Sequence, residues 1–342
     1  MTNQTHRARY LDIAKGLGIL CITFLHYENG VIPTTVNIFI GSFMITIFYF
    51  VSGWIMGMKS KPETTSVLFK KRLRSLGLPY LYWTGIILAF DLILWAFGYY
   101  NAYFIARETY KSIVLRGIGT LWFLPALFFG EIIWNWLSQK SRWYWILGIV
   151  IIFAYQWAFG NIFANKNTDI WNIIKAPFIS INSVGGAIIV VAAGYLAYRI
   201  IDRIQLLRIK GLTFLIGFFI CISAYFSANY LSNWFGLEVT KYIWSICAPI
   251  LGPLGFILMF YCIQSSRMLD YFDYWGQNSL SLMVTHYSIV QVLLTIIVIK
   301  IVHIPFNGWI TIMTFIISMP IQYLITEMLN RYSPTLLRPS KR

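Results

Sequence analysis

The sequence predicts an all-α integral membrane protein with about ten transmembrane helices and both termini in the cytoplasm. Of its 342 residues, 58% are hydrophobic and only 11% are charged, and the mean hydropathy is +0.66. A soluble protein carries roughly a quarter charged residues. Apolar stretches of about 20 residues, long enough to cross a bilayer, recur along the whole sequence. Basic residues gather between alternate stretches, which sets the orientation.

We interpret the apolar stretches as helices, because an open sheet cannot satisfy its backbone in hydrocarbon and these runs do not alternate like barrel strands. Trp and Tyr lie at the ends of the stretches, as in Tyr80-Leu-Tyr-Trp83 and Arg142-Trp-Tyr-Trp145. Such residues anchor helices at the membrane interface. The predicted spans are 11–27, 36–58, 76–98, 119–137, 143–160, 184–201, 211–231, 242–263, 276–298 and 309–329.

The orientation follows from the 27 Lys and Arg residues. Nineteen lie on the side that holds the N-terminus, the exits of the even-numbered spans and the C-terminus, and seven lie on the other side. Lys15 lies within a span. This bias places both termini in the cytoplasm. The net charge of +15 is therefore mostly a topology signal. Because the basic residues are scattered over short loops beside lipid, nucleic acid is not an expected partner.

The domain organisation is expected to be simple, with a single transmembrane domain over residues 1–342 and no attached soluble domain. The longest predicted non-membrane stretches are 59–75, 99–118 and 161–183. The sequence shows no 20- to 50-residue repeat and no inverted pair of Gly- or Pro-broken spans, which weakens a secondary-transporter interpretation. The four cysteines lie in apolar runs without metal-ligand spacing, so we predict neither a disulfide framework nor a metal site.

Lys15 and His26 stand out in the first span, because ionisable groups inside a membrane are costly. They are eleven residues apart, which is about three helical turns and roughly 16 Å along the axis, so they share one face. Lys15 lies near the cytoplasmic end and His26 near the external end. The structural alternative is that Lys15 reaches the headgroups and pairs with Asp12 at i,i+3, while His26 caps the span.

Further polar residues lie in later spans. Ser279 and Asn278 precede His286 by seven and eight residues, so all three share a face on a continuous helix. A structural hydrogen-bonding role for His286 is at least as well supported as catalysis. Glu131 and Asp91 are intramembrane carboxylates that could orient a histidine, relay a proton or neutralise a buried cation. We favour neutralisation for Asp91.

The predicted internal loop 59–75 contains four positive charges within five residues, in the segment Lys70-Lys-Arg-Leu-Arg74. Lys71, Arg72 and Arg74 suit an anionic ligand such as a phosphate, which arginine can bind with two parallel hydrogen bonds. The alternative is ordinary positive-inside charge that touches anionic lipid. P-loop, zincin and α/β-hydrolase motifs are absent from the sequence.

Taken together, five stretches resemble the acyltransferase-3 family of integral membrane acyltransferases, which includes bacterial polysaccharide O-acetyltransferases. The likeness follows the family order over nearly the whole chain. The matching stretches are Lys15 with His26, Phe48-Tyr-Phe-Val-Ser-Gly-Trp54, Lys71-Arg-Leu-Arg74 before Pro79, Leu121-Trp-Phe-Leu-Pro125, and Gly276-Gln-Asn-Ser279 with His286. One departure is Lys71, which stands where the family's R-x-x-R-like element has its first arginine.

The resemblance implies transfer of an acyl group from cytoplasmic acyl-CoA, here acetyl-CoA or another acyl-CoA as co-substrate, to a hydroxyl of a cell-surface or lipid-linked glycan. Some family members carry an extracytoplasmic esterase-like domain, which this sequence lacks. The protein is expected to be a multi-pass protein of the plasma membrane, the bacterial inner or cell membrane. Its expected partners are membrane lipids, acyl-CoA and the glycan; a homodimer is one option for the oligomeric state. The rival class is a polysaccharide flippase, polymerase or exporter.

The resemblance also distributes roles over the candidate residues. His26 is the expected general base, because an imidazole with a pKa near 6.5 can accept the proton of an attacking hydroxyl. Lys15 is expected to steady the acyl donor. His286 and Glu131 complete the candidate catalytic set. The residues expected to contact the donor are Lys71, Arg72, Arg74, Ser52, Trp122, Asn278 and Ser279.

Overall fold

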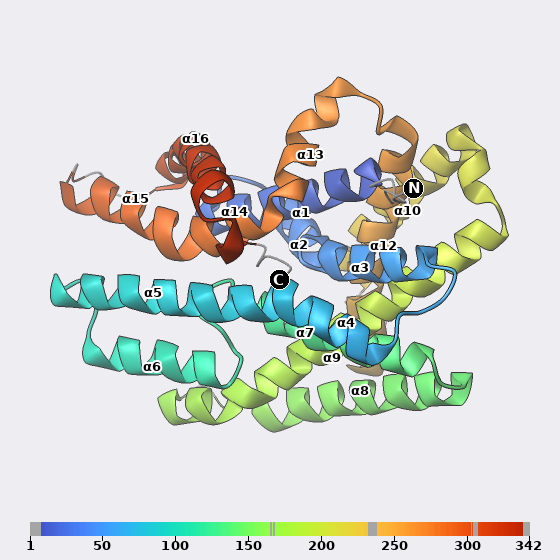
Figure 1. The fold of residues 1–342 in the computed structure, drawn as a ribbon, viewed down its shortest axis with the longest axis horizontal. Coiled ribbons are helices and arrows are strands. Elements are labelled where there is room, and N and C mark those ends of the chain that lie inside the picture. The colour runs from blue at the N-terminus through green and yellow to red at the C-terminus, as the bar shows by residue number, and fades with distance from the viewer. Residues whose placement is uncertain are drawn as a thin grey trace. The chain divides into compact units, whose positions relative to one another are not determined.

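The structure confirms an all-α membrane protein. It is a computed structural model that describes residues 8–164, 166, 168–231, 238–301, 303 and 307–337, and every regular element in these ranges is a helix (Figure 1). By length and composition, eight helical segments among the described residues are able to cross a membrane. These are Thr34–Met58, Thr65–Ala96, Arg142–Phe163, Asp169–Arg203, Lys210–Asn229, Ile246–Ile263, Ser279–Ile299 and Gly308–Tyr332.

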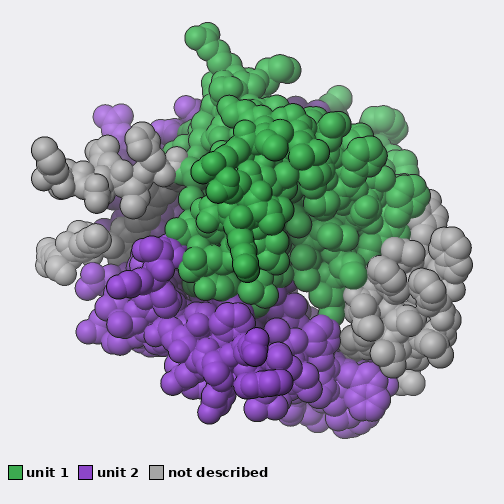
Figure 2. Space-filling model, turned by 90° about the vertical axis from the view of Figure 1, so that its right-hand side faces the viewer, with its two compact units in different colours: residues 1–58, 192–282, 307–315 green, residues 59–191, 283–306, 316–342 purple. Residues whose placement is uncertain are grey.

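The chain divides into two compact units (Figure 2). Unit 1 comprises Met1–Met58, Ala192–Leu282 and Asn307–Phe315, and unit 2 comprises Lys59–Val191, Met283–Phe306 and Ile316–Arg342. The helices of the first half are α1 Arg9–Tyr27, α2 Thr34–Phe43, α3 Thr46–Met58, α4 Thr65–Arg72, α5 Leu78–Ala96, α6 Ala102–Ile113, α7 Phe123–Ser138 and α8 Arg142–Phe163. A π-helical turn, η1 Leu73–Gly77, joins α4 to α5.

The second half begins with α9, which runs through both units. Its helices are α9 Asp169–Arg203, α10 Lys210–Phe226, α12 Glu238–Ile263, α13 Asp270–Gln277, α14 Ser279–Thr285, α15 Val292–Ile296 and α16 Gly308–Tyr332. Short 3-10 turns are η2 Leu206–Arg208, η4 Arg267–Leu269 and η7 Pro334–Leu336, and π-helical segments are η3 Ser227–Leu231, η5 His286–Gln291 and η6 Ile297–Ile301. The expectation that residues 1–342 form a single transmembrane domain stays a prediction.

Each of the ten predicted spans corresponds to helical structure, but three predicted loops are largely helical as well. The 59–75 loop becomes helical at Thr65, and the 161–183 loop at Asp169. Polar and charged residues do not end a helix by themselves, and neither helix has a Gly or Pro in its first turn. The 99–118 loop contains α6, whose first turn is capped by Asn101 Oδ1, which accepts a hydrogen bond from the Phe104 N–H at 2.8 Å.

Two of the predicted spans correspond to helices that are not among the eight segments able to cross a membrane. Helix α1 carries Arg9, Asp12 and Lys15, and α7 has only 16 residues. More than half of the α1 side chains are buried, including Asp12. Since α1 packs inside unit 1 against α2, α3, α12 and α13, its charges contact protein rather than lipid. This burial explains how a helix with three charges fits the protein interior.

Helix α1 is held against α13 by a close glycine crossing within unit 1. A Cβ atom at Gly276 would overlap the backbone oxygen of Asp12, and one at Gly16 would overlap that of Phe272. Only glycine allows the backbones to approach this closely. At its N-terminal end, α1 is tied to α13 by Arg9, which forms ion pairs with Asp270 and Asp273. These contacts fix the helix that carries Lys15 and His26.

Helix α7 organises unit 2. It contacts α4, η1 and α8, and Phe128 packs edge-on against Phe69 of α4 with ring centroids 5.5 Å apart. Gly130 leaves room for Ala187 of α9. Helices α5 and α6 lie side by side (Figure 1), and the Tyr80 hydroxyl donates to the Ser112 carbonyl at 2.8 Å. The core of unit 2 therefore forms around the helix that carries Glu131.

Candidate functional site

Lys15 lies on α1 and pairs with Asp12. Its Nζ is 2.6 Å from Asp12 Oδ1, and the side chains are 24% and 5% exposed. Asp12 is therefore the buried partner, and the Lys15 side chain stays partly exposed. This i,i+3 pair is the one that the structural alternative predicts, and it neutralises the carboxylate without hiding the cation.

His26 is in the last turn of α1, where its side chain is half-buried. Lys15 and His26 lie on one uninterrupted helix. Their positions on the helix backbone therefore share a face, as predicted. The helix ends at Tyr27, and Glu28 follows as its C-cap. His26 thus lies at the junction between a buried helix and the loop that leads to α2.

Glu28 organises this loop. Its carboxylate accepts hydrogen bonds from the Val31 N–H at 2.6 Å, the Ile32 N–H at 3.1 Å and Asn37 Nδ2 at 2.9 Å. Burial acts to raise the pKa of Glu28, but the hydrogen bonds, led by that of Ile32, outweigh it and lower the pKa. Glu28 is therefore an ionised carboxylate that holds the α1–α2 connection beside His26.

Ser52 is half-buried in the middle of α3. Two residues later, Trp54 is fully buried and its indole N–H donates to the Tyr10 hydroxyl of α1 at 3.0 Å. This bond links the helix of Ser52 to the helix of Lys15 inside unit 1. This hydrogen bond explains how the segment around Ser52 is positioned. Contact between Ser52 and the acyl donor stays a prediction.

The helix breaks at Asn278, contrary to the prediction of one continuous helix through Asn278, Ser279 and His286, while Ser279 and His286 lie in the continuous helical segment Ser279–Ile299. Asn278 is the C-cap of α13, and its Nδ2 donates back to the Tyr274 carbonyl at 3.0 Å. Helix α14 begins afresh at Ser279. The physical reason is local, because an asparagine side chain that bonds the preceding turn competes with helix continuation.

The predicted donor-binding segment lies on α4 and η1 in unit 2, and α7 holds it in place. Arg72 forms an ion pair with Glu131 of α7. The Glu131 side chain is 1% exposed and that of Arg72 is 23% exposed. Of the roles considered for Glu131, the structure displays neutralisation of a cation. Arg72 is therefore anchored to α7 in the middle of the basic segment rather than extended into solvent.

The other basic residues of this segment are more accessible. Lys71 Nζ lies 3.4 Å from Glu63 Oε1 and remains 55% exposed. Glu63 also pairs with Lys59 at 2.7 Å, and that hydrogen bond lowers the pKa of Glu63. Lys70 and Arg74 are exposed, and within the described part of the chain neither makes an ion pair. These two carry the uncompensated charge of the segment.

His286 is completely buried at the start of η5 in unit 2. The preceding Thr285 donates its hydroxyl to Gln322 Oε1 of α16 at 2.6 Å, and both side chains are buried. π-Helical turns often mark functional positions. A fully buried imidazole also fits a structural hydrogen-bonding role. The structure is therefore consistent with both predicted roles of His286, structural and catalytic.

The loop between α6 and α7 packs against η5. Thr120 donates its hydroxyl to the Met283 carbonyl at 2.7 Å, and a Cβ at Gly119 would contact Ser288 and Tyr287. Gly119 has a φ of +53°, a conformation that favours glycine. Trp122 follows at the start of α7, half-buried, with the guanidinium carbon of Arg116 5.9 Å from its ring centroid.

The candidate residues therefore form separate groups within the units. Unit 1 holds Lys15 with Asp12, His26, Ser52, Asn278 and Ser279, and unit 2 holds Arg72 with Glu131, Lys71, Arg74, Trp122 and His286. Among the described residues, no group of three or more His, Cys, Asp or Glu side chains could hold a metal ion. The chemistry available to these groups is proton transfer at imidazole and binding of anions.

Sequence reasoning missed the residues that dock the basic segment. Asn135 Nδ2 of α7 donates to the Glu63 carbonyl at 2.9 Å, and Gln139 Nε2 donates to the same oxygen at 3.2 Å. Asn135 could have been found as a buried polar residue inside a predicted span, the same signal that singled out Glu131. Glu63 could have been found from its i,i+4 spacing to Lys59.

Comparison with known protein families now gives the class. Residues 8–325 match the acyltransferase-3 family, which is described as an acyltransferase domain, and the match runs through both units. The chain is an integral membrane acyltransferase by fold and sequence. It belongs to the acyltransferase-3 family. No curated protein and no solved structure matches the chain.

Proposed function

We propose that this protein is a membrane O-acyltransferase that moves an acyl group, an acetyl group in the simplest case, from cytoplasmic acyl-CoA to a hydroxyl of a cell-surface or lipid-linked glycan. The observation that carries the proposal is the match of residues 8–325 to an acyltransferase family. The cation and the imidazole on the buried helix α1 support it. In this proposal the protein resides in the plasma membrane.

The proposed reaction is direct transfer without a covalent enzyme intermediate. His26 accepts the proton of the glycan hydroxyl while its oxygen attacks the thioester carbonyl carbon. The carbon–sulfur bond then breaks, and the CoA sulfur leaves with the proton that the imidazolium returns. Products are the O-acyl ester and free CoA, so that atoms and charge balance. Lys15, whose side chain stays partly exposed beside Asp12, steadies the donor.

The basic segment on α4 and η1 is the proposed binding site for the CoA phosphates. Lys70 and Arg74 offer exposed charge, and Lys71 is more than half exposed. Each charge-assisted contact to a phosphate contributes about 1.5–3 kcal/mol. Arg72, anchored by Glu131, is suited to holding the segment in position and to presenting its remaining N–H groups.

The first prediction tests the reaction itself. Protein reconstituted in vesicles should transfer radiolabelled acetyl groups from acetyl-CoA to glycan. His26→Gln keeps hydrogen bonding but is not a base at neutral pH, so transfer should fall by about 10²–10⁴-fold. CoA binding should be unchanged, because the base acts on the acceptor. His303→Gln, at an exposed histidine, is the matched control.

Two results would contradict the proposal. Absence of label from glycan with the wild-type protein would favour a flippase, polymerase or exporter, because these classes have no use for a thioester. Transfer by His26→Gln at the wild-type rate would leave the acyltransferase class intact but remove His26 as the base. His286 would then be the next residue to test.

A further inference from the structure

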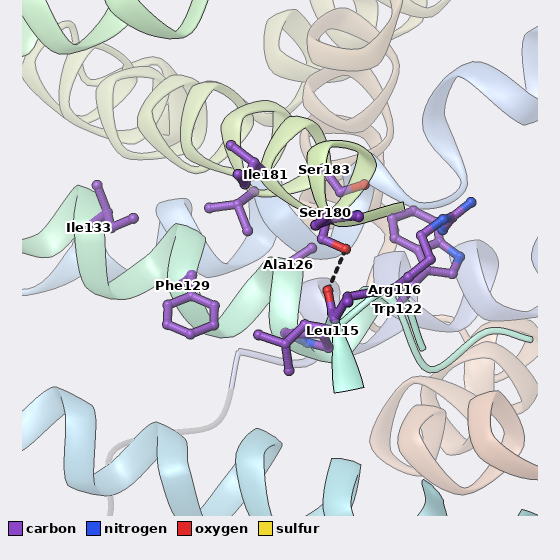
Figure 3. A pocket seen from close by; sticks show the side chains of 13 residues that line it. Leu115, Arg116, Trp122, Ala126, Phe129, Ile133, Ser180, Ile181 and Ser183 are labelled. Atoms are coloured by element: carbon purple, nitrogen blue, oxygen red, sulfur yellow. Dashed lines mark hydrogen bonds between the residues drawn. The ribbon is translucent and has the colours of Figure 1, made fainter. Parts of the chain in front are cut away.

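A pocket of about 400 Å³ lies entirely within unit 2 (Figure 3), and no residue of the α4–η1 segment lines it. Its volume is in the range of small-molecule sites. The walls come from the α6–α7 loop, α7 and α9. The lining residues are Val114, Leu115, Arg116, Trp122, Pro125, Ala126, Phe129, Ile133, Pro177, Ser180, Ile181, Ser183 and Val184. Of the residues expected to contact the acyl donor, Trp122 alone belongs to this lining.

The two ends of the pocket differ in chemistry. Figure 3 shows Arg116 and Trp122 together at one end, and Phe129 and Ile133 of α7 at the other. Phe129 is 36% exposed and Ile181 is 53% exposed. In a protein that spans a membrane, exposed apolar side chains of this kind suit contact with lipid hydrocarbon. The pocket is therefore amphipathic along its length.

Arg116 supplies the single formal charge of this lining. It contacts the Trp122 ring, and among the described residues no carboxylate lies within ion-pair distance of it. Glu108, the carboxylate that influences it electrostatically, already pairs with Arg107 at 2.9 Å and Lys111 at 2.7 Å. Arg116 thus presents an uncompensated cation that suits an anionic group with planar hydrogen-bond acceptors.

The pocket interior does not suit a sugar. Its two hydroxyl side chains already donate to backbone carbonyls, Ser180 to Val114 at 2.9 Å and Ser183 to Ile179 at 3.0 Å. A glycan hydroxyl buried there would meet mainly apolar carbon and lose hydrogen bonds to water. An apolar chain loses nothing polar on entering. The lining therefore favours a hydrocarbon chain joined to an anion.

We infer that this pocket binds an anionic phospholipid, with the phosphate against Arg116 beside Trp122 and one acyl chain along Phe129, Ile133 and Ile181. Charge complementarity selects the headgroup, and the exposed apolar side chains suit a lipid of the surrounding bilayer. Apart from Trp122, the site contains none of the residues assigned to acyl transfer, and its occupation does not depend on the identity of the acceptor.

The test is fluorescence quenching of Trp122 by brominated lipid, with the protein in nanodiscs. The Trp122 signal is the difference between the intact protein and Trp122→Phe. Phosphatidylglycerol brominated on its acyl chains should quench this signal at lower mole fractions than brominated phosphatidylcholine. Arg116→Gln should weaken the preference for phosphatidylglycerol about tenfold or more, the loss expected for one charge-assisted phosphate contact.

Lys166→Gln is the matched control, because Lys166 forms a cation–π contact with Trp171 at 4.1 Å and does not line the pocket. It should leave the preference unchanged. Equal quenching by both lipids, or a preference that survives Arg116→Gln, would overturn the inference. Relief of quenching by a long-chain acyl-CoA would also overturn it, since the pocket would then belong to the acyl chain of the donor.

Discussion

At the scale of single residues, two buried carboxylates decide how two candidate cations are presented. Asp12 holds Lys15 through an i,i+3 pair, and Glu131 holds Arg72 across two helices of unit 2. A carboxylate buried without a cation would be costly. Because each acid is more deeply buried than its partner, the carboxylates act as fixed anchors and the cations keep part of their surface for a ligand.

The Arg72–Glu131 pair should matter for stability more than the surface pairs beside it. Glu131→Gln keeps the size of the side chain but leaves Arg72 uncompensated, so we expect a loss of about 1–3 kcal/mol. This is less than for a fully buried pair, because Arg72 is partly solvated. The midpoint of thermal unfolding in detergent measures the change. Glu63→Gln, which breaks more exposed pairs, should cost less than about 1 kcal/mol, and equal effects would contradict this ranking.

Lys15 should affect the donor rather than the acceptor. Lys15→Ala should weaken binding of acyl-CoA, while Lys15→Arg retains the positive charge and should keep part of the activity. Isothermal titration with CoA gives the affinity of each variant. Lys210→Ala removes an exposed cation of the same unit and serves as the control. Unchanged donor affinity in Lys15→Ala would reduce Lys15 to the structural partner of Asp12.

The sequence was sufficient to select the ionisable candidate residues, but it could not predict all of the ion pairs that they form. The Asp12–Lys15 pair could be predicted, because local helix geometry places residues i and i+3 together. The Arg72–Glu131 pair could not, since it joins residues far apart in the chain and depends on how α4 and η1 pack on α7. The same limit applies to Arg116 and its pocket, which appear only once α7 and α9 form its walls.

At the scale of helices, each predicted span coincides with helical structure, but the helical segments Thr65–Ala96 and Asp169–Arg203 extend well beyond the spans predicted for them. Hydropathy detects the part of a helix that lies in lipid, whereas α4 and the first turns of α9 carry polar residues and extend beyond it. The π-helical turn η1 precedes Pro79. A proline lacks the N–H for the preceding turn, and a π turn accommodates the missing bond. Such adjustments leave no signal in hydropathy.

The crossing of α1 and α13 should be intolerant of any side chain at its glycines. Gly276→Ala places a methyl group against the Asp12 backbone oxygen, so we expect a loss of about 1–3 kcal/mol or more from overpacking. Thermal unfolding in detergent measures it. Gly41→Ala is the matched control within unit 1, because no atom lies within 4 Å of the added Cβ, and it should be neutral or slightly stabilising. Similar midpoints for both variants would argue against a tight crossing.

The α6–α7 loop connects two features of unit 2 that the sequence did not relate. Leu115, Arg116 and Trp122 line the pocket, while Gly119 packs on η5 and Thr120 bonds to Met283 of α14. Leu115 has a φ of +60°, which is uncommon for a residue other than glycine and costs free energy. The loop is therefore fixed by contacts on both sides, and a lipid at Arg116 would brace the wall against which η5 packs.

At the scale of the whole molecule, the membrane imposes the charge distribution. Nineteen of the 27 basic residues fall on the side predicted to be cytoplasmic. The structure confirms a helical membrane protein with several candidate spans, and the direction in which the chain is inserted stays a prediction. The proposed use of cytoplasmic acyl-CoA requires the basic α4–η1 segment to face the cytoplasm. A measurement of the topology therefore also tests the proposed donor site.

Cysteine labelling in intact cells measures this topology. In a background without the native cysteines, Ala102→Cys and Thr168→Cys should react with a membrane-impermeant maleimide, whereas Ser66→Cys should react only after permeabilisation. All three positions are exposed in the structure, so a lack of labelling reports the side of the membrane rather than burial. Strong labelling of Ser66→Cys in intact cells would place the basic segment outside, where CoA is absent, and would remove it as the donor site even if acyl transfer were observed.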